Sequence, residues 1–208
     1  MLPLKTYIPN KILFHPKSYI LLQINTSLKL LSSHLTDDDL ASLLQKWTHK
    51  ITLNRFDYLC KTGQIENRIY YINKGTFRTY SLDKGIEKDE IFGFPNDFYC
   101  SFVSLLTQEP TKNNIQALSK AEVIGINRTD FYQVILSNRK LERVWRQHTE
   151  QLLIQRVERS LLLRSTSIQK VKLLLENKAE IFQLIPNKYI ASYLDMSPAT
   201  LSRMLKQL

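Results

Sequence analysis

Cysteine is scarce in this 208-residue chain, which contains only Cys60 and Cys100. Two thiols cannot build a disulfide scaffold, a zinc ribbon or a four-cysteine iron–sulfur site within one chain. Long apolar runs are also missing: no run exceeds four residues, whereas a membrane-spanning helix needs about 20. The first residues lack the apolar core of a secretory signal. We therefore expect two reduced, partly buried thiols in a cytoplasmic protein without a membrane partner.

Glycine is confined to the middle of the chain, because all five glycines lie between positions 63 and 125. Tight turns need glycine and helix interiors disfavour it, so the middle is expected to be rich in strands and the last part helical. Short segments of β-branched and aromatic residues, separated by turn signals at a spacing of about 8–12 residues, predict a sandwich or small barrel. The expected strands are 68–72, 76–80, 87–94, 115–118 and 122–126.

Two features precede these strands. Residues 1–20 contain three prolines and three lysines but no acidic residue, and we interpret them as an extended N-terminal arm. Residues 25–47 are expected to contain a helix, because Thr36 and three following aspartates make a favourable helix start before an apolar face.

The net charge of +10 is concentrated near the C-terminus. Residues 134–208 carry thirteen basic and six acidic side chains, which leaves +7 in this third of the chain. A basic end attached to a neutral middle predicts a polyanion-binding part beside a separate core. Charge alone does not distinguish DNA, RNA, a membrane surface or a merely solvated basic face.

Two helices are expected directly after the strands, a short one at 129–137 and a long one at about 138–164. Apolar residues recur along the long helix at spacings of three and four, which predicts a rod of about 40 Å. Such a helix beside a small β domain indicates packing against a symmetric twin, with packing on its own chain as the alternative. The seam is assigned to Leu141, Trp145, His148 and Leu152, followed by a neighbouring stripe of Leu153, Val157 and Leu161. His148 has no second histidine at ligand spacing, so no metal site is expected.

The last residues predict a helix-turn-helix. An amphipathic helix at 169–176 is followed by helices at 187–194 and 197–206, with Asp195 and Met196 as the turn between them. Ser197 is a favourable N-cap, and Pro198 occupies the first helical position, where its missing N–H costs nothing. The second helix of such a motif enters the DNA major groove.

The residues expected at the DNA come from both of these helices. Arg203 is the long fork donor suited to a guanine edge or a phosphate. The full DNA-binding set is Lys188, Ser197, Pro198, Ala199, Thr200, Ser202, Arg203 and Lys206. Phosphate contacts are also conceivable from the basic residues of the long helix, namely Arg156, Arg159 and Arg164.

At this point the chain resembles the Crp/Fnr family of bacterial transcription regulators over about residues 20–208. The similarity rests on Ile69–Gly75 with Arg78 and Tyr80, and on Tyr189–Leu194 with Ser197–Arg203. It implies an α+β fold with a cyclic-nucleotide-binding-like β jelly roll, a long dimerisation helix and a C-terminal helix-turn-helix. The implied division is an arm (1–20), a sensor domain (21–137), a dimerisation helix (138–164) and a DNA-binding domain (165–208).

The chain departs from this family where cyclic nucleotide would bind. Members that bind cAMP carry a Gly-Glu pair for the ribose and, about ten residues later, Arg-Ser or Arg-Thr for the phosphate. Here the corresponding pocket residues are Ser101, Thr111, Lys112 and Asn113. Losing the arginine removes a bidentate, charge-assisted contact, so cAMP binding of the usual kind is not expected. The N-terminus of a short helix near 97–101 is expected to offer backbone N–H groups instead. The pocket either holds another small effector or is vestigial.

The DNA-binding end departs as well. Pro198 and Ala199 stand where the cAMP receptor protein has a base-reading Arg-Glu pair, and no β-wing follows the last helix before Leu208. We therefore expect a homodimeric regulator of double-stranded DNA with an operator of its own, and no cofactor is assigned. The alternative is a small-ligand sensor that acts through protein partners and carries a degenerate DNA-binding domain. No nucleophile–base–acid set or phosphate loop predicts an enzyme.

Overall fold

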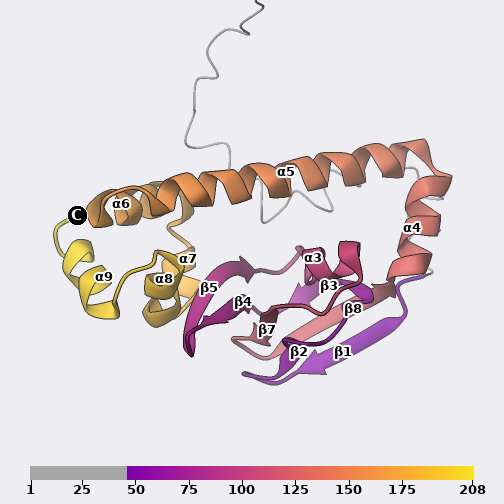
Figure 1. The fold of residues 1–208 in the computed structure, drawn as a ribbon, viewed down its shortest axis with the longest axis horizontal. Helices are drawn as coiled ribbons and strands as arrows, with labels where there is room; N and C mark the ends of the chain where they lie inside the picture. The colour runs from indigo at the N-terminus through magenta and orange to yellow at the C-terminus, as the bar shows by residue number, and fades with distance from the viewer. Residues whose placement is uncertain (1–45) are drawn as a thin grey trace, which may run out of the picture.

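The computed structural model describes residues 46–208, so the expected arm at 1–20 and the expected helix up to residue 45 lie outside the described residues (Figure 1). Eight strands and seven helices are assigned within the described part. The strands are β1 (His49–Leu53), β2 (Tyr58–Cys60), β3 (Arg68–Lys74), β4 (Phe77–Asp83), β5 (Ile86–Gly93), β6 (Phe98–Tyr99), β7 (Asn113–Ala117) and β8 (Ala121–Asn127). The helices are α3 (Phe102–Thr107), α4 (Arg128–Ser137), α5 (Arg139–Leu163), α6 (Ser167–Lys178), α7 (Ile181–Leu184), α8 (Asn187–Tyr193) and α9 (Pro198–Leu205).

The strands form two four-stranded sheets, with the orders β1-β8-β3-β6 and β2-β7-β4-β5, and every pairing is antiparallel. Inward residues of both sheets, among them Ile72, Phe77, Ile115 and Val123, are fully buried in one apolar cluster. Alternate residues of each strand supply this cluster, as expected for two sheets that pack face to face. We call this unit, residues 49–127, the β-sandwich.

The five expected strands are confirmed as β3, β4, β5, β7 and β8. Three strands were not expected. Strands β2 and β6 have three and two residues, and β1 reads His-Lys-Ile-Thr-Leu with only its last residue buried. Such short or largely exposed strands leave little periodicity in a sequence. Gly75 was expected at a turn. Its φ is 92°, and backbone atoms lie 2.7 Å from the place that a Cβ atom would take, so this position requires glycine.

Two predicted helices follow the β-sandwich. Helix α4 begins at Arg128 after the N-cap Asn127, slightly earlier than expected. Helix α5 begins after Asn138, whose side-chain oxygen accepts hydrogen bonds from the N–H groups of Lys140 and Leu141. The 25 residues of α5 run along the whole molecule above the β-sandwich (Figure 1). None of the helices in the described residues is long and apolar enough to cross a membrane.

Trp47 was expected at the end of a helix, and this prediction is wrong. The residue lies outside any helix and is buried, with its indole ring 5.6 Å from the ring of Phe98. Its partners come from residues about 50 positions later in the chain, a contact that local sequence periodicity does not contain. The N-terminus of a short helix was expected near 97–101, and α3 begins at Phe102 with Ser101 as its N-cap, at the end of this stretch.

The last helices pack around a second core. Val171, Ile190, Leu194 and Leu201 are almost completely buried in it. Helix α6 begins with a capping box, in which the Gln169 side chain accepts a hydrogen bond from the Thr166 N–H. The core also contains Phe92 and Leu118 of the β-sandwich. The C-terminal helices are therefore joined to the β-sandwich by shared apolar burial as well as by the chain.

Candidate nucleic-acid interface and effector pocket

Helices α8 and α9 are joined by a tight turn, and together they form what we call the α8–α9 unit (residues 187–205). Asp195 takes the left-handed conformation with a φ of 52°, which Asp tolerates better than most residues. The Met196 N–H then donates to the Ala191 carbonyl oxygen at 3.0 Å. The Lys170 ammonium donates to the Leu194 carbonyl oxygen at 3.0 Å, which satisfies the end of α8.

The start of α9 is built as its sequence predicts. The Ser197 hydroxyl oxygen accepts a hydrogen bond from the Thr200 N–H at 3.1 Å, and Pro198 occupies the first turn. Leu201 and Met204 are buried against α8, where Ala191 is completely buried. The apolar face of α9 therefore fixes its polar face toward solvent.

The residues predicted to bind DNA gather on that outer side. All of them are exposed except Thr200, which is half-buried. The Thr200 hydroxyl lies 2.9 Å from the Ser197 hydroxyl, so part of its hydrogen-bonding capacity is used within the helix. Lys188, at the start of α8, places its ammonium 4.6 Å from the centre of the Tyr189 ring. The polar side of α9 thus carries Arg203 and Lys206 as exposed cationic side chains, and Lys188 is exposed at the start of α8.

The predicted effector residues also come together, but without the charges that a phosphate would need. Ser101 and Thr111 are both buried, and their hydroxyl oxygens lie 2.7 Å apart. The Thr111 hydroxyl oxygen additionally accepts a hydrogen bond from the Asn113 N–H at 3.1 Å. Lys112, by contrast, is exposed. These two hydroxyls bind each other in the stretch that was assigned from the sequence to the effector pocket.

The acidic groups near this pair differ in how their charge is balanced. The Asn113 amide donates to Glu90 at 2.9 Å, and Glu90 lies 3.6 Å from the guanidinium of Arg156. Glu66 is buried beside the start of α3, and burial raises the pKa of its carboxyl above the usual value. Such an acidic setting disfavours an anionic ligand.

Aromatic rings fill the space between the β-sandwich and the first half of α5. The His148 ring stacks on Trp145 at 5.4 Å and lies 5.8 Å from the Phe98 ring and 6.3 Å from the Phe102 ring. Burial lowers the pKa of His148 to about 4, so its imidazole is neutral at pH 7. No group of three potential metal ligands is found in residues 46–208.

This cluster corrects the assignment of the dimer seam. Leu141 is 1% exposed and packs with Trp145 in the core beneath α5, so this stripe faces the chain's own β-sandwich. Leu152 is half-buried. The exposed apolar stripe is the neighbouring one, in which Leu153, Val157 and Leu161 are 66%, 53% and 57% exposed. Helix α5 carries two neighbouring apolar stripes, and the sequence alone did not show which of them the β-sandwich covers.

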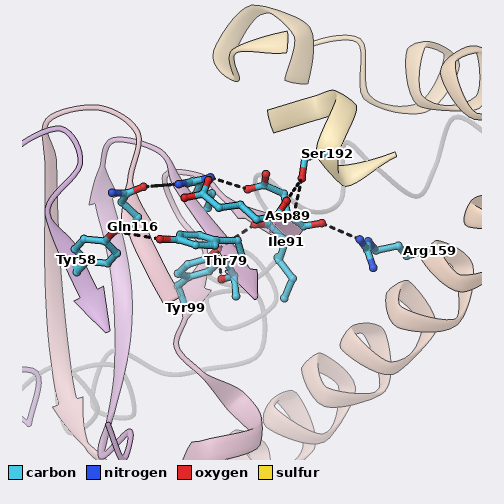
Figure 2. Close-up of polar contacts among 11 residues, drawn as sticks. Tyr58, Thr79, Asp89, Ile91, Tyr99, Gln116, Arg159 and Ser192 are labelled. Carbon is cyan, nitrogen blue, oxygen red and sulfur yellow. Dashed lines mark hydrogen bonds and ion pairs between the residues drawn. The ribbon is translucent and has the colours of Figure 1, made fainter. Parts of the chain in front are cut away.

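Sequence reasoning missed the polar contacts between β5 and the C-terminal helices. Figure 2 shows Asp89 between the Ser192 hydroxyl of α8 and the guanidinium of Arg159 on α5. Asp89 is 1% exposed, and burial is the main reason that its pKa is raised to about 6. On the other side, Arg78 binds Gln116 through two N–H groups at 2.8 and 3.0 Å. These partners are 38 to 103 positions apart and leave no local signal in a sequence.

The two cysteines are free and buried, as expected. Burial raises the pKa of the Cys60 thiol to about 12, which makes it a poor nucleophile. These thiols therefore belong to the core of the β-sandwich.

Comparisons with known proteins agree with this architecture. Residues 50–138 match the family model of the cyclic nucleotide-binding domain. A search of curated protein sequences finds no significant match. The fold matches FixK2 from Bradyrhizobium japonicum with a TM-score of 0.65 at 19% identity, covering 77% of this chain and 83% of that chain.

Two further solved structures share the arrangement. The c-di-GMP responsive global regulator CLP from Xanthomonas campestris has a TM-score of 0.64 at 14% identity, over 83% of this chain and 91% of that chain. The catabolite activator protein from Thermus thermophilus has a TM-score of 0.50 at 18% identity, over 86% of each chain. At these identities the likeness shows the fold alone, a cyclic-nucleotide-binding-type β-sandwich with helices, which is the coarser part of what the sequence resemblance implied.

Proposed function

We propose that this chain is a Crp/Fnr-type transcription regulator, a homodimer that binds specific sites on duplex DNA through the α8–α9 unit. The observation that carries the proposal is the outer face of α9, which is polar, exposed and rigidly capped by Ser197. A helix with short polar and long cationic side chains on one face suits sequence-specific binding in the DNA major groove. The similar solved structures include an activator and a global regulator, which supports this class over an enzyme. A bacterial regulator of this kind would work in the cytoplasm, where the DNA lies.

The side chains divide into two roles. Arg203 has a fork of N–H donors that fits a guanine edge, and Thr200 and Ser202 are short enough to bind neighbouring bases. Lys188 and Lys206 stand at the ends of the face and would bind phosphates, which adds affinity without sequence preference. Pro198 and Ala199 offer only apolar contact, for example to a thymine methyl group.

The dimer is proposed to form through the second half of α5. Leu153, Val157 and Leu161 follow one another at four-residue spacing and leave an exposed apolar stripe. Two such stripes packed together would remove apolar surface from water. Each Å² of buried apolar surface contributes about 25 cal/mol of free energy, which favours the association of parallel helices. A symmetric pair would present its two α9 helices to successive turns of the major groove, about 34 Å apart.

We further propose that any effector of the β-sandwich is not bound through a cyclic phosphate. A phosphate at Ser101 and Thr111 would find two mutually bonded hydroxyls near Glu66 and Glu90, and the nearby guanidinium of Arg156 is already paired with Glu90. CLP is described as responsive to c-di-GMP, but the charges of the present pocket suit an uncharged ligand better. DNA binding without added nucleotide is therefore expected.

The proposal is tested by selecting binding sites from random duplex DNA with the purified protein at about 150 mM salt, without a ligand. Enrichment of a two-fold symmetric sequence is the expected result. Salt-dependent binding without enrichment would mean that the two α9 helices are out of register unless an effector is bound. Absence of any binding to duplex DNA would reject the proposed function and favour a sensor that acts through protein partners.

A further inference from the structure

Two arginines of α5, one turn apart, contact strand β5. Their guanidinium groups are therefore engaged within the chain, whereas from the sequence alone they were considered for contacts with DNA phosphates. The Arg156 guanidinium lies 3.6 Å from the Glu90 carboxylate. The Arg159 guanidinium donates to the Asp89 carbonyl oxygen at 2.8 Å and to the Tyr193 carbonyl oxygen at 3.4 Å. It also lies 4.9 Å from the centre of the Tyr193 ring. Arg159 of α5 thus contacts both β5 and α8. Figure 2 shows its bond to Asp89 of β5.

The α8–α9 unit meets β5 through a second set of contacts beside Arg159. The Ser192 hydroxyl oxygen accepts a hydrogen bond from the Asp89 N–H at 2.9 Å and donates to the Glu87 carbonyl oxygen at 3.1 Å. Lys88 forms an ion pair with Asp195, the residue of the turn between α8 and α9. We call these contacts, together with those of Arg159, the β5–α8 joint. They fix the turn before α9 as well as α8 itself.

Strand β5 has an irregularity at the joint. Its pairing with β4 shifts between Thr79, opposite Ile91, and Tyr80, opposite Asp89, so Glu90 has no partner on β4. Such a bulge turns a side chain away from the regular alternation. Glu90 accepts a hydrogen bond from the Asn113 amide, and the Asn113 N–H donates to Thr111, the partner of Ser101. A series of polar contacts therefore runs from the effector pocket to Glu90 and Arg156. Glu90 directly follows Asp89, the β5 residue of the joint, in the chain.

We propose that Arg159 is a positioning residue that sets the orientation of α9 relative to the β-sandwich, and that Asn113 and Glu90 connect this orientation to the effector pocket. The inference rests on the proposed function, because orientation matters only if two α9 helices read one DNA site. Each base pair added between half-sites displaces them by about 3.4 Å and rotates them by roughly a tenth of a turn. A joint that fixes α9 therefore makes the dimer selective for one spacing.

The first test needs no DNA. Hydrogen–deuterium exchange is measured on the full chain for wild type, Arg159→Gln and the control Arg139→Gln, which makes the same charge change at an exposed position on the first turn of α5. We expect Arg159→Gln to raise exchange at least threefold in peptides covering 86–91 and 187–195, while Arg139→Gln leaves both unchanged. Arg159→Lys should restore protection partly, since an ammonium replaces one hydrogen bond but lacks the planar fork. Unchanged exchange in Arg159→Gln would overturn the proposal.

The second test measures affinity for the selected site and for versions with one or two base pairs added or removed between the half-sites. Arg159→Gln should bind the selected site less tightly and lose most of the discrimination against altered spacing, whereas Arg139→Gln should keep it. Increased exchange with intact spacing discrimination would show that Arg159 is only structural and would overturn the positioning role. If wild type binds no duplex DNA, the proposed function fails, and the exchange data still report on the joint.

The connection to the pocket is tested by Asn113→Ala, which removes the amide that binds Glu90 and leaves Arg159 intact. We expect increased exchange in 86–91 and 187–195, smaller than that of Arg159→Gln. The control is Asn67→Ala, which removes an exposed amide directly before β3. An Asn113→Ala variant with wild-type exchange at 187–195 would overturn the link between pocket and joint.

Discussion

The hydroxyl oxygens of Ser101 and Thr111, which are buried on either side of α3, lie 2.7 Å apart. Each hydroxyl is a partner of the other, in a place with little access to water. Because an unpaired buried hydroxyl is costly, the two residues act as a unit. The proposed effector pocket is built around this pair, and no cyclic phosphate is expected to bind there.

Thr111→Val should lower the free energy of unfolding by about 1–2 kcal/mol, because it leaves the Ser101 hydroxyl without its partner. The double variant Ser101→Ala with Thr111→Val should lose less than the sum of the two single variants, since neither hydroxyl is then left unpaired. Urea unfolding measures these values, with Thr52→Val on exposed β1 as the control. Strict additivity of the two single variants would contradict the pairing.

Cyclic AMP at about 1 mM should not raise the melting temperature of the protein. A ligand that binds the native state at a hundred times its dissociation constant stabilises it by about 2.7 kcal/mol, so even weak binding is detectable. A clear rise in the melting temperature would contradict the account of the pocket. It would also show that other groups replace the missing arginine.

Val157→Glu should convert the dimer to a monomer of 24.4 kDa, because it places a carboxylate in the exposed apolar stripe of α5. Gln133→Glu, at an exposed position of α4, adds the same charge outside the stripe and should leave the dimer intact. Sedimentation equilibrium distinguishes these outcomes. A dimer that persists in Val157→Glu would move the interface elsewhere.

Acid should destabilise the fold through His148. Burial lowers its pKa from 6.5 to about 4, so the unfolded chain binds more protons than the native state between these two values. Its contribution to stability is therefore complete above pH 6.5 and is lost as the pH falls toward 4. His148→Phe should retain about 2 kcal/mol more stability than wild type at pH 4.5 relative to pH 7.5. Parallel pH profiles of the two proteins, followed by chemical unfolding, would contradict the burial of this imidazole.

Local sequence signals predicted the elements but not their contacts. Ser197 with Pro198 marked the start of α9, and Asn138 stands at the start of α5, because caps depend on neighbouring residues. The covered stripe of α5 depends instead on Phe98 and Phe102, more than 40 residues earlier.

The candidate sites follow the same division. The exposed face of α9 could be predicted from its helical period, and Ser101 and Thr111 could be placed through the resemblance to a family. The β5–α8 joint could not be predicted, because Ser192 reaches Asp89 across 103 positions of the chain. A hydrogen bond of this kind depends on how two independently formed units dock, and no periodicity within either unit encodes that docking.

The most direct test of the account is the affinity of Arg203→Ala for the selected DNA site and for a scrambled duplex of equal length, at several salt concentrations. Arg203 should supply about 1–3 kcal/mol of discrimination for a guanine contact in each half-site. The account predicts that the variant loses most of its preference for the selected site and keeps most of the salt-dependent binding to the scrambled duplex. Equal losses on both duplexes would contradict the assignment of α9 as the helix that reads the sequence.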